Sequence, residues 1–192
     1  MNAVLVLKPL MRVLAFDDGF FEPKKKGRAL LVGVLSRFDN RIEGIVSTQI
    51  AVDGFDSTKK ILQLFANSRF GEQAQFIFLS GLNFAGFNIV DVQLLFKKTK
   101  KPVVVVFRKK PNLEKFFSAI KKTRSAEKRL LLAKKAGRIF SAGTVFFQAI
   151  GLEEKSAREL IKRLCRHSNL PEPLRLAHLV ASGISLGEST RP

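Results

Sequence analysis

Two groups of carboxylates lie directly after apolar segments in the first third of the chain. Asp17 and Asp18 end one such segment, and Asp53 and Asp56 follow another. Mg²⁺ and Mn²⁺ prefer oxygen ligands, and Mg²⁺ keeps several waters beside one or two protein carboxylates. Asp17, Asp53 and Asp56 are therefore candidate metal ligands, with Mg²⁺ or Mn²⁺ as the expected cofactor. The alternative is structural, because Asp-Gly pairs form turns and Asp56 can cap a helix.

We do not expect both carboxylates of the first pair to enter one site directly. Asp17 and Asp18 are adjacent, so their side chains point to opposite faces of a strand. At most one of them is expected to reach a given site directly. Asp17 is the candidate catalytic carboxylate, together with Asp53, while Asp18 and Gly19 are candidates for the lining of the pocket.

A sheet must position these carboxylates, and the chain has the pattern of one. The β-branched run Pro102–Phe107 is typical of a central strand covered on both faces. Strands are expected at 12–17, 29–37, 42–52, 76–79, 102–107 and 144–150, with a hairpin turn at Asp39 and Asn40. Helices are expected after Asp56 and at 87–98, 113–123, 125–135, 153–167 and 171–183. This order predicts a single α/β domain over residues 1–192, with helices packed on a mixed sheet.

Positive charge is in large excess and is concentrated. The chain has 34 Lys and Arg residues against 16 acidic ones, a formal charge of +18. The segment 97–138 holds 16 Lys or Arg residues against Glu114 and Glu127, and so supplies +14 of that charge. Either these charges lie on separate solvated faces, or they form a patch that attracts phosphates; we favour the patch, with DNA or RNA as partner. The candidate contacts are Arg108, Lys109, Lys110, Lys121, Lys122 and Arg124.

Several other classes of protein are disfavoured. A single cysteine, Cys165, allows no internal disulfide and fits a reducing compartment, and its place in an apolar helical stripe predicts an inert core thiol. No apolar run approaches the roughly 18 residues of a membrane helix. We therefore expect a cytoplasmic protein without membrane association. No Walker loop or dinucleotide fingerprint is present, so no nucleotide cofactor is expected.

Five segments resemble a known family. They read FDDGFF, VDGFDSTKKI, LSGLNFAGFNIVD, KPVVVVFRKKP and PEPLRLAHLVASGISLGES. They are similar to segments of the archaeal domain-of-unknown-function family ninety-nine, from about Arg12 to Ser189. That family resembles endonuclease V in turn. The resemblance implies a ribonuclease H-like fold, in which a mixed sheet of three antiparallel strands and then parallel strands is flanked by helices.

The resemblance also implies roles for the carboxylates. Ribonuclease H-like nucleases place one carboxylate in the first strand and another at the end of the fourth, where they hold metals that activate water. Asp17 matches the first, and Asp53 or Asp56 matches an acidic residue between the third strand and the first helix. The fourth-strand position, Asp-Gly in endonuclease V, reads Ser80-Gly81, and Ser does not supply the missing charge. The chain also has no Tyr for the Pro-Tyr wedge of endonuclease V.

The last matching segment places three polar residues on an expected helix. Glu172, Arg175 and His178 recur every three residues along one side of it. They either pair with one another or, as in ribonuclease H-like enzymes, bring polar groups to the metals. In the second case His178 acts as an acid or base, or contacts phosphate, and Arg175 binds nucleic acid.

The loop after the fourth strand has a structural and a functional interpretation as well. Gly81 and Gly86 either permit a tight turn or belong to a pocket at the carboxyl end of the sheet, where α/β proteins bind ligands. The candidate lining residues of that pocket are Asp18, Gly19, Asp56, Ser80, Gly81, Gly86, Phe87, Asn88 and Glu172.

Three functions are consistent with these features. The first is a nucleic-acid-binding protein on a ribonuclease H-like fold, with a divalent-metal site that is weak or lost. The second is an active Mg²⁺- or Mn²⁺-dependent endonuclease acting on DNA or RNA. The third is a small-molecule or nucleotide-binding protein that uses the loops around Gly86 and Glu172. Ser80 and the missing wedge favour binding over cleavage.

Overall fold

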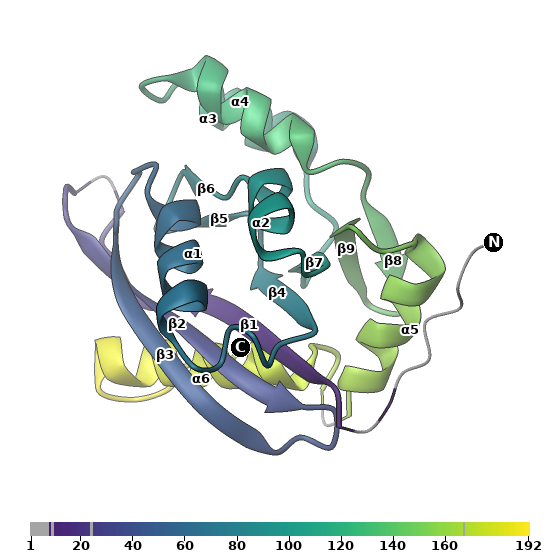
Figure 1. The fold of residues 1–192 in the computed structure, drawn as a ribbon. Coiled ribbons are helices and arrows are strands. Elements are labelled where there is room, and N and C mark those ends of the chain that lie inside the picture. The colour runs from purple at the N-terminus through teal and green to yellow at the C-terminus, as the bar shows by residue number, and fades with distance from the viewer. Residues whose placement is uncertain (1–7, 9, 24, 167) are drawn as a thin grey trace.

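Seven strands form one mixed sheet in the order β3-β2-β1-β4-β7-β9-β8 (Figure 1). The computed structural model describes residues 8, 10–23, 25–166 and 168–192. The first three strands are antiparallel, and β4 and β7 run parallel to β1. The fold class expected from the sequence is therefore confirmed. The seven strands are β1 (Arg12–Asp18), β2 (Arg28–Arg37), β3 (Ile42–Ala51), β4 (Phe76–Ser80), β7 (Val103–Phe107), β8 (Phe140–Ala142) and β9 (Val145–Ile150).

Helices cover both faces of this sheet because its central strands are apolar on both sides. Leu14 and Phe16 of β1 pack on one face, and Val13 and Ala15 pack on the other. All four are fully buried. On the first face lie α1 (Ser57–Asn67), α2 (Val92–Thr99), α3 (Leu113–Lys121) and α4 (Ala126–Lys135); on the second lie α5 (Glu154–Leu164) and α6 (Glu172–Leu186).

Parallel pairing brings the carboxyl ends of three strands to one edge of the sheet. Phe16 of β1 pairs with Leu79 of β4, and Ser80 pairs with Val106 of β7. The residues that follow these pairs, Asp17 on β1 and Arg108 after β7, therefore lie at the same edge. This edge is where α/β proteins place their ligands.

Several elements differ from the sequence-based expectation. The helix expected from Phe87 begins only at Val92, because Asn88 and Ile89 form a short strand, β6 (Asn88–Ile89), that pairs with β5 (Asn83–Phe84). The strand β8 was not expected; its three residues give too short a pattern. The helix expected at 153–167 ends at Leu164, and residue 167 lies outside the described residues. Cys165 follows it, half-buried, and burial raises the pKa of its thiol to about 11.

The last helix lies across β1 and β2 and approaches the chain closely just after β1 (Figure 1). A Cβ atom at Gly19 would lie 2.8 Å from the carbonyl oxygen of Ala181. Only glycine permits this approach without a shift of the helix. The helix continues through Gly183 to Leu186 instead of ending near Gly183. It is this packing that brings His178 toward the end of β1.

The hairpin of α3 and α4 projects beyond the carboxyl end of β7 (Figure 1). Most basic residues of segment 97–138 are exposed on this hairpin, on the loop before it or near the end of α2. Lys101 is half-buried, and Arg129 is buried, with 2% of its surface exposed. Among the helices of the described chain, none is long and apolar enough to cross a membrane.

Candidate active site

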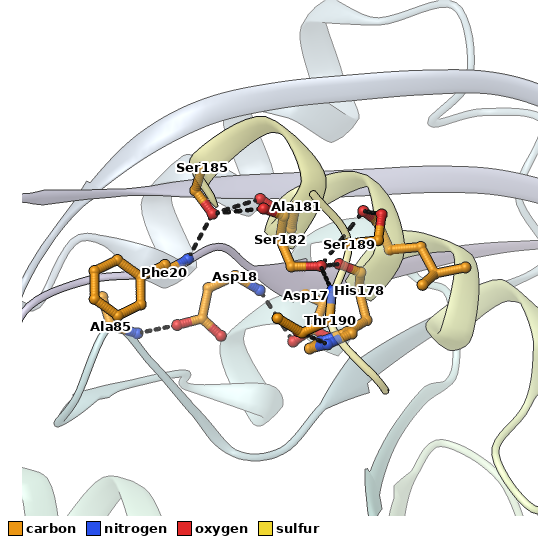
Figure 2. A network of polar contacts seen from close by, with 11 residues as sticks. Asp17, Asp18, Phe20, Ala85, His178, Ala181, Ser182, Ser185, Ser189 and Thr190 are labelled. Carbon is orange, nitrogen blue, oxygen red and sulfur yellow. Dashed lines mark hydrogen bonds and ion pairs between the residues drawn. The ribbon is translucent and has the colours of Figure 1, made fainter. Parts of the chain in front are cut away.

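The carboxylate of Asp17 meets the ring of His178 across 161 residues of sequence. Asp17 is 5% exposed, and its Oδ2 atom lies 3.0 Å from His178 Nδ1. Its Oδ1 atom accepts a hydrogen bond of 3.0 Å from the amide of Asp18. Figure 2 shows the two side chains pointing toward one another between β1 and α6. The sequence placed both residues in a site, and the fold brings them together.

The second nitrogen of His178 is held as well. Nε2 lies 3.0 Å from the hydroxyl of Thr190, and the Thr190 amide donates to the hydroxyl of Ser182 (Figure 2). Ser182 in turn donates to the main-chain carbonyl of His178 at 2.8 Å. Because both ring nitrogens have partners, the orientation of the imidazole is fixed. A ring fixed in this way also holds the Asp17 carboxylate in one orientation.

An open cavity of about 510 Å³ lies over this pair. Its polar lining includes Asp17, Asp18, His178 and the exposed Arg108. The other lining residues are Gly19, Phe20, Phe21, Pro23, Ser182, Leu186 and Thr190. A guanidinium binds phosphate through two parallel hydrogen bonds. One cavity therefore combines a buried carboxylate, an oriented imidazole and an exposed guanidinium suited to phosphate.

The donors of this cavity fit a limited kind of metal site. Among the residues that the structure describes, no three His, Cys, Asp or Glu side chains come together as a complete metal-binding group. Ser80, which was expected to line the pocket, ends β4 but does not line this cavity, and its hydroxyl is neutral. A Mg²⁺ ion needs only one or two protein carboxylates when water and substrate phosphate supply its other oxygen ligands. Asp17 could serve as a ligand in such an arrangement, whereas the residues of this cavity could not enclose a metal ion with protein ligands alone.

The side chain of Asp18 points away from His178, toward Ala85 (Figure 2). Asp18 nevertheless lines the same cavity as Asp17, because both stand at the end of β1, so the expectation that at most one of them reaches the site is wrong. Its Oδ2 atom accepts a hydrogen bond of 2.6 Å from the amide of Ala85. Burial raises the pKa of Asp18 to about 7; the Ala85 amide lowers this pKa, and the charge of Asp17 raises it further. Asp18 therefore fixes the loop after β4 to the end of β1.

The raised pKa predicts that stability depends on pH through Asp18. Between about pH 4 and pH 7 the folded protein keeps this proton while the unfolded chain has released it, so stability falls as pH rises through this range and is then level. Asp18→Asn keeps an acceptor for the Ala85 amide and removes the ionisation. In thermal unfolding without divalent metal, we expect its melting temperature to exceed that of the wild type at pH 8 and to approach it at pH 4. The exposed Glu72→Gln is the control, and an equal gain at both pH values would contradict the assignment.

Asp53 and Asp56 do not line the cavity of Asp17. Asp53 accepts a hydrogen bond of 2.8 Å from the amide of Phe87, and Asp56 accepts bonds from the amide of Ala51 and, at 2.7 Å, from Asn88. Asp56 stands before α1 but its side chain does not cap that helix, because it turns back to β3. Both carboxylates hold the chain between β3 and β6, and their part in metal binding stays a prediction.

The loop after β4 relies on glycine at two places. Gly81 has a φ of +91° and Gly86 a φ of +83°, so both allow backbone that other residues rarely adopt. A Cβ atom at Gly86 would lie 2.4 Å from Asp53 Oδ1. The expected tight turn is therefore present. Gly81, Gly86, Phe87 and Asn88 do not line the cavity of Asp17.

Arg129 organises the same loops, a role that no pattern in the sequence predicted. Its Nε donates 2.8 Å to the carbonyl of Phe87, and its other nitrogens donate to the carbonyls of Asp53 and Arg124. The guanidinium also lies over the ring of Phe55, 4.3 Å from the centroid. Burial lowers the pKa of this guanidinium. Within a run of exposed Lys and Arg, nothing distinguished the one residue that folds inward.

The remaining candidate residues are Glu172 and Arg175 on α6 and the basic residues of segment 97–138. Arg175 pairs with Glu172 through bonds of 2.8 and 2.5 Å, and this bond raises the pKa of Arg175. The pair lies on α6 away from the cavity, as the self-paired interpretation expects. The side chains free to meet a polyanion are exposed ones: Arg108, Lys109, Lys110, Lys121, Lys122 and Arg124.

The amino-acid sequence is similar to one family of proteins over most of its length. The family model described as Endonuclease dU matches residues 9–185. The chain belongs to the endonuclease dU family. A UPF0215 protein of Thermococcus sibiricus is 42% identical over 191 residues, covering 96% of this chain and 97% of the relative. The assignment to the archaeal domain-of-unknown-function family ninety-nine, made from the motifs, stays a prediction.

Solved structures extend the similarity from the endonuclease dU family to a wider fold. A protein of unknown function from Archaeoglobus fulgidus is 38% identical, with a TM-score of 0.86 over 92% of this chain and 99% of that one. Endonuclease V of Ciona intestinalis, in complex with a 24mer DNA containing an inosine, is 15% identical, with a TM-score of 0.56 over 88% and 83%. At this identity the second likeness concerns the fold alone, and it confirms the endonuclease V-like architecture.

Proposed function

We propose that the protein is a divalent-metal-dependent endonuclease that cuts DNA at a deaminated base, with deoxyuridine as the first candidate. The observation that carries the proposal is the Asp17–His178 pair beside Arg108 at the carboxyl edge of the sheet. The endonuclease dU family and the endonuclease V-like fold support the reaction class and the substrate. The leading alternative is binding without cleavage, which the neutral Ser80 favours.

Each residue of the cavity has a role that its contacts suit. Asp17 would hold Mg²⁺ or Mn²⁺, and the ion when bound would supply a Lewis acid for the phosphate and a more acidic water. His178 holds the Asp17 carboxylate in one orientation, and so is a positioning residue. Arg108, exposed at the rim, binds the phosphate of the strand and orients it.

The test is a cleavage assay with end-labelled single- and double-stranded DNA that carries one deoxyuridine, one deoxyinosine or neither. We expect a cut near the deoxyuridine with Mn²⁺ or Mg²⁺ and none with EDTA. Cleavage that persists in EDTA would overturn the metal-dependent reaction. Tight binding without any cut under all metal conditions would establish the alternative, a binding protein.

The basic hairpin predicts a strong salt dependence of DNA binding. Each phosphate that a Lys or Arg neutralises lowers log K by roughly 0.7 to 0.9 per log unit of salt. The double variant Lys121→Gln/Lys122→Gln should reduce this slope by roughly 1 to 2 in a fluorescence titration, because both side chains are exposed on the hairpin. Lys155→Gln/Lys162→Gln on α5 removes the same charge elsewhere. Equal slopes for the two double variants would show that the hairpin is not the interface.

A further inference from the structure

A second, smaller cavity lies under α3, on the face of the sheet opposite His178. Its volume is about 240 Å³, and the rings of Phe107, Phe116 and Phe117 line it. The Phe116 and Phe117 centroids are 5.9 Å apart. Asn112 and Leu113 are exposed, so the cavity opens to the surface beside them. Aromatic walls of this kind suit a flat ring, because every nucleobase has a π-face on which Phe stacks.

One of the polar side chains that line this cavity, Gln148, has a buried acceptor atom that receives no hydrogen bond from the described part of the chain. Gln148 of β9 is 4% exposed, and its Nε2 donates 2.9 Å to the carbonyl of Gly137. That bond decides which end of the amide is nitrogen and which is oxygen. The Oε1 atom is buried, and no donor in the described part of the chain reaches it. A buried acceptor without a donor costs free energy, which a ligand carrying an N–H group would recover.

We propose that this cavity receives one nucleobase turned out of the DNA strand, and that Gln148 Oε1 accepts a hydrogen bond from a ring N–H of that base. The proposal rests on the proposed function and deepens it, because it names the residue that reads the base. Deamination converts the ring nitrogen of the pairing edge from a hydrogen-bond acceptor to a donor. Cytosine and adenine carry a lone pair at the ring nitrogen of their pairing edge, whereas uracil and hypoxanthine carry an N–H there.

The surroundings of the cavity suit a strand of DNA. The exposed Lys109 and Lys110 lie in the chain between Phe107 and Pro111, two residues that line the cavity, and so place positive charge near it. Leu82 and Asn83, which line the cavity, belong to the loop that Asp18 fixes through Ala85. One loop after β4 therefore connects the base cavity with the edge that carries Asp17. An extruded base is held while the neighbouring backbone lies on the basic surface.

The decisive experiment compares two single-stranded oligonucleotides that differ only in uracil or cytosine at one position. Binding is measured by fluorescence anisotropy in EDTA, so that no cleavage occurs. We expect the wild type to prefer uracil by about 10-fold to 100-fold, the range of a hydrogen bond made or left unmade in a buried site. Gln148→Met keeps the length of the side chain but has no acceptor, and should reduce the preference to within about 3-fold.

Two further variants serve as a matched control and as an independent test of the cavity. Gln93→Met is the matched control, because Gln93 also donates to a main-chain carbonyl, that of Lys135, but lies outside the cavity. Ala133→Leu fills the cavity from α4 and should abolish the uracil preference even where Gln148→Met unfolds the protein. With 5-fluorouracil in the oligonucleotide, the fluorine resonance should shift on binding to the wild type and not on binding to Ala133→Leu.

The outcomes separate this inference from the proposed function. A uracil preference in EDTA without any cleavage in Mn²⁺ would overturn the endonuclease and leave the base cavity. Metal-dependent cleavage at deoxyuridine with an unchanged preference in Gln148→Met and Ala133→Leu would overturn the cavity and leave the endonuclease. Equal wild-type affinity for uracil and cytosine would also overturn the role of Gln148.

Discussion

Asp17→Asn should lower the rate of cleavage at deoxyuridine by about 10³-fold or more, which corresponds to about 4 kcal/mol of transition-state stabilisation. The substitution keeps the shape of the side chain and an oxygen for His178, and it removes the buried charge that would hold the metal. The rate is measured under single-turnover conditions with saturating Mn²⁺, so that DNA binding does not limit it. Circular dichroism and thermal unfolding establish that the variant is folded.

Asp56→Asn is the matched control for this experiment. Asp56 contacts the Ala51 amide and Asn88 rather than the cavity of Asp17, so its substitution should affect stability more than the rate. A rate loss in Asp56→Asn as large as that in Asp17→Asn would show that the third-strand carboxylate is a ligand after all. A rate within about 3-fold of the wild type in Asp17→Asn would remove Asp17 from the site.

Arg129→Met should lower the free energy of unfolding by about 3–5 kcal/mol. The substitution leaves the carbonyls of Asp53 and Arg124 without this donor, whereas the Phe87 carbonyl keeps its hydrogen bond from the Ile89 amide. Each buried acceptor left unsatisfied costs about 1–3 kcal/mol. Some relaxation of the loops reduces the sum. Urea unfolding followed by circular dichroism measures the change.

The neighbouring residue provides the control for Arg129. Lys128 also lies over the ring of Phe55, 4.5 Å from the centroid, but is exposed. Lys128→Met should change the free energy of unfolding by less than about 0.5 kcal/mol. Arg129→Lys should recover only part of the loss, because an ammonium group lacks the planar set of donors. Equal effects of Arg129→Met and Lys128→Met would contradict the role of the buried guanidinium.

The architecture was readable from the sequence because strand patterns are local. The β-branched run of β7 occupies a few neighbouring residues, and this prediction is confirmed. The short strands β5, β6 and β8 were missed, since two or three residues carry too little pattern and their pairing depends on distant contacts. The basic segment was found as a count of charges, without the information that Arg129 turns inward.

The sequence by itself determined the kinds of residue available: a carboxylate at the end of the first strand, a histidine on the last helix and an excess of cations after the fourth strand. Only the tertiary structure decided which of them meet. Asp17 and His178 are 161 residues apart and come together because α6 packs on β1 at Gly19. Asp53 and Asp56 have the same chemistry but are drawn to main-chain amides by the loops around them. The partner of a polar side chain is set by the packing of whole elements, and that packing depends on contacts far apart in the chain.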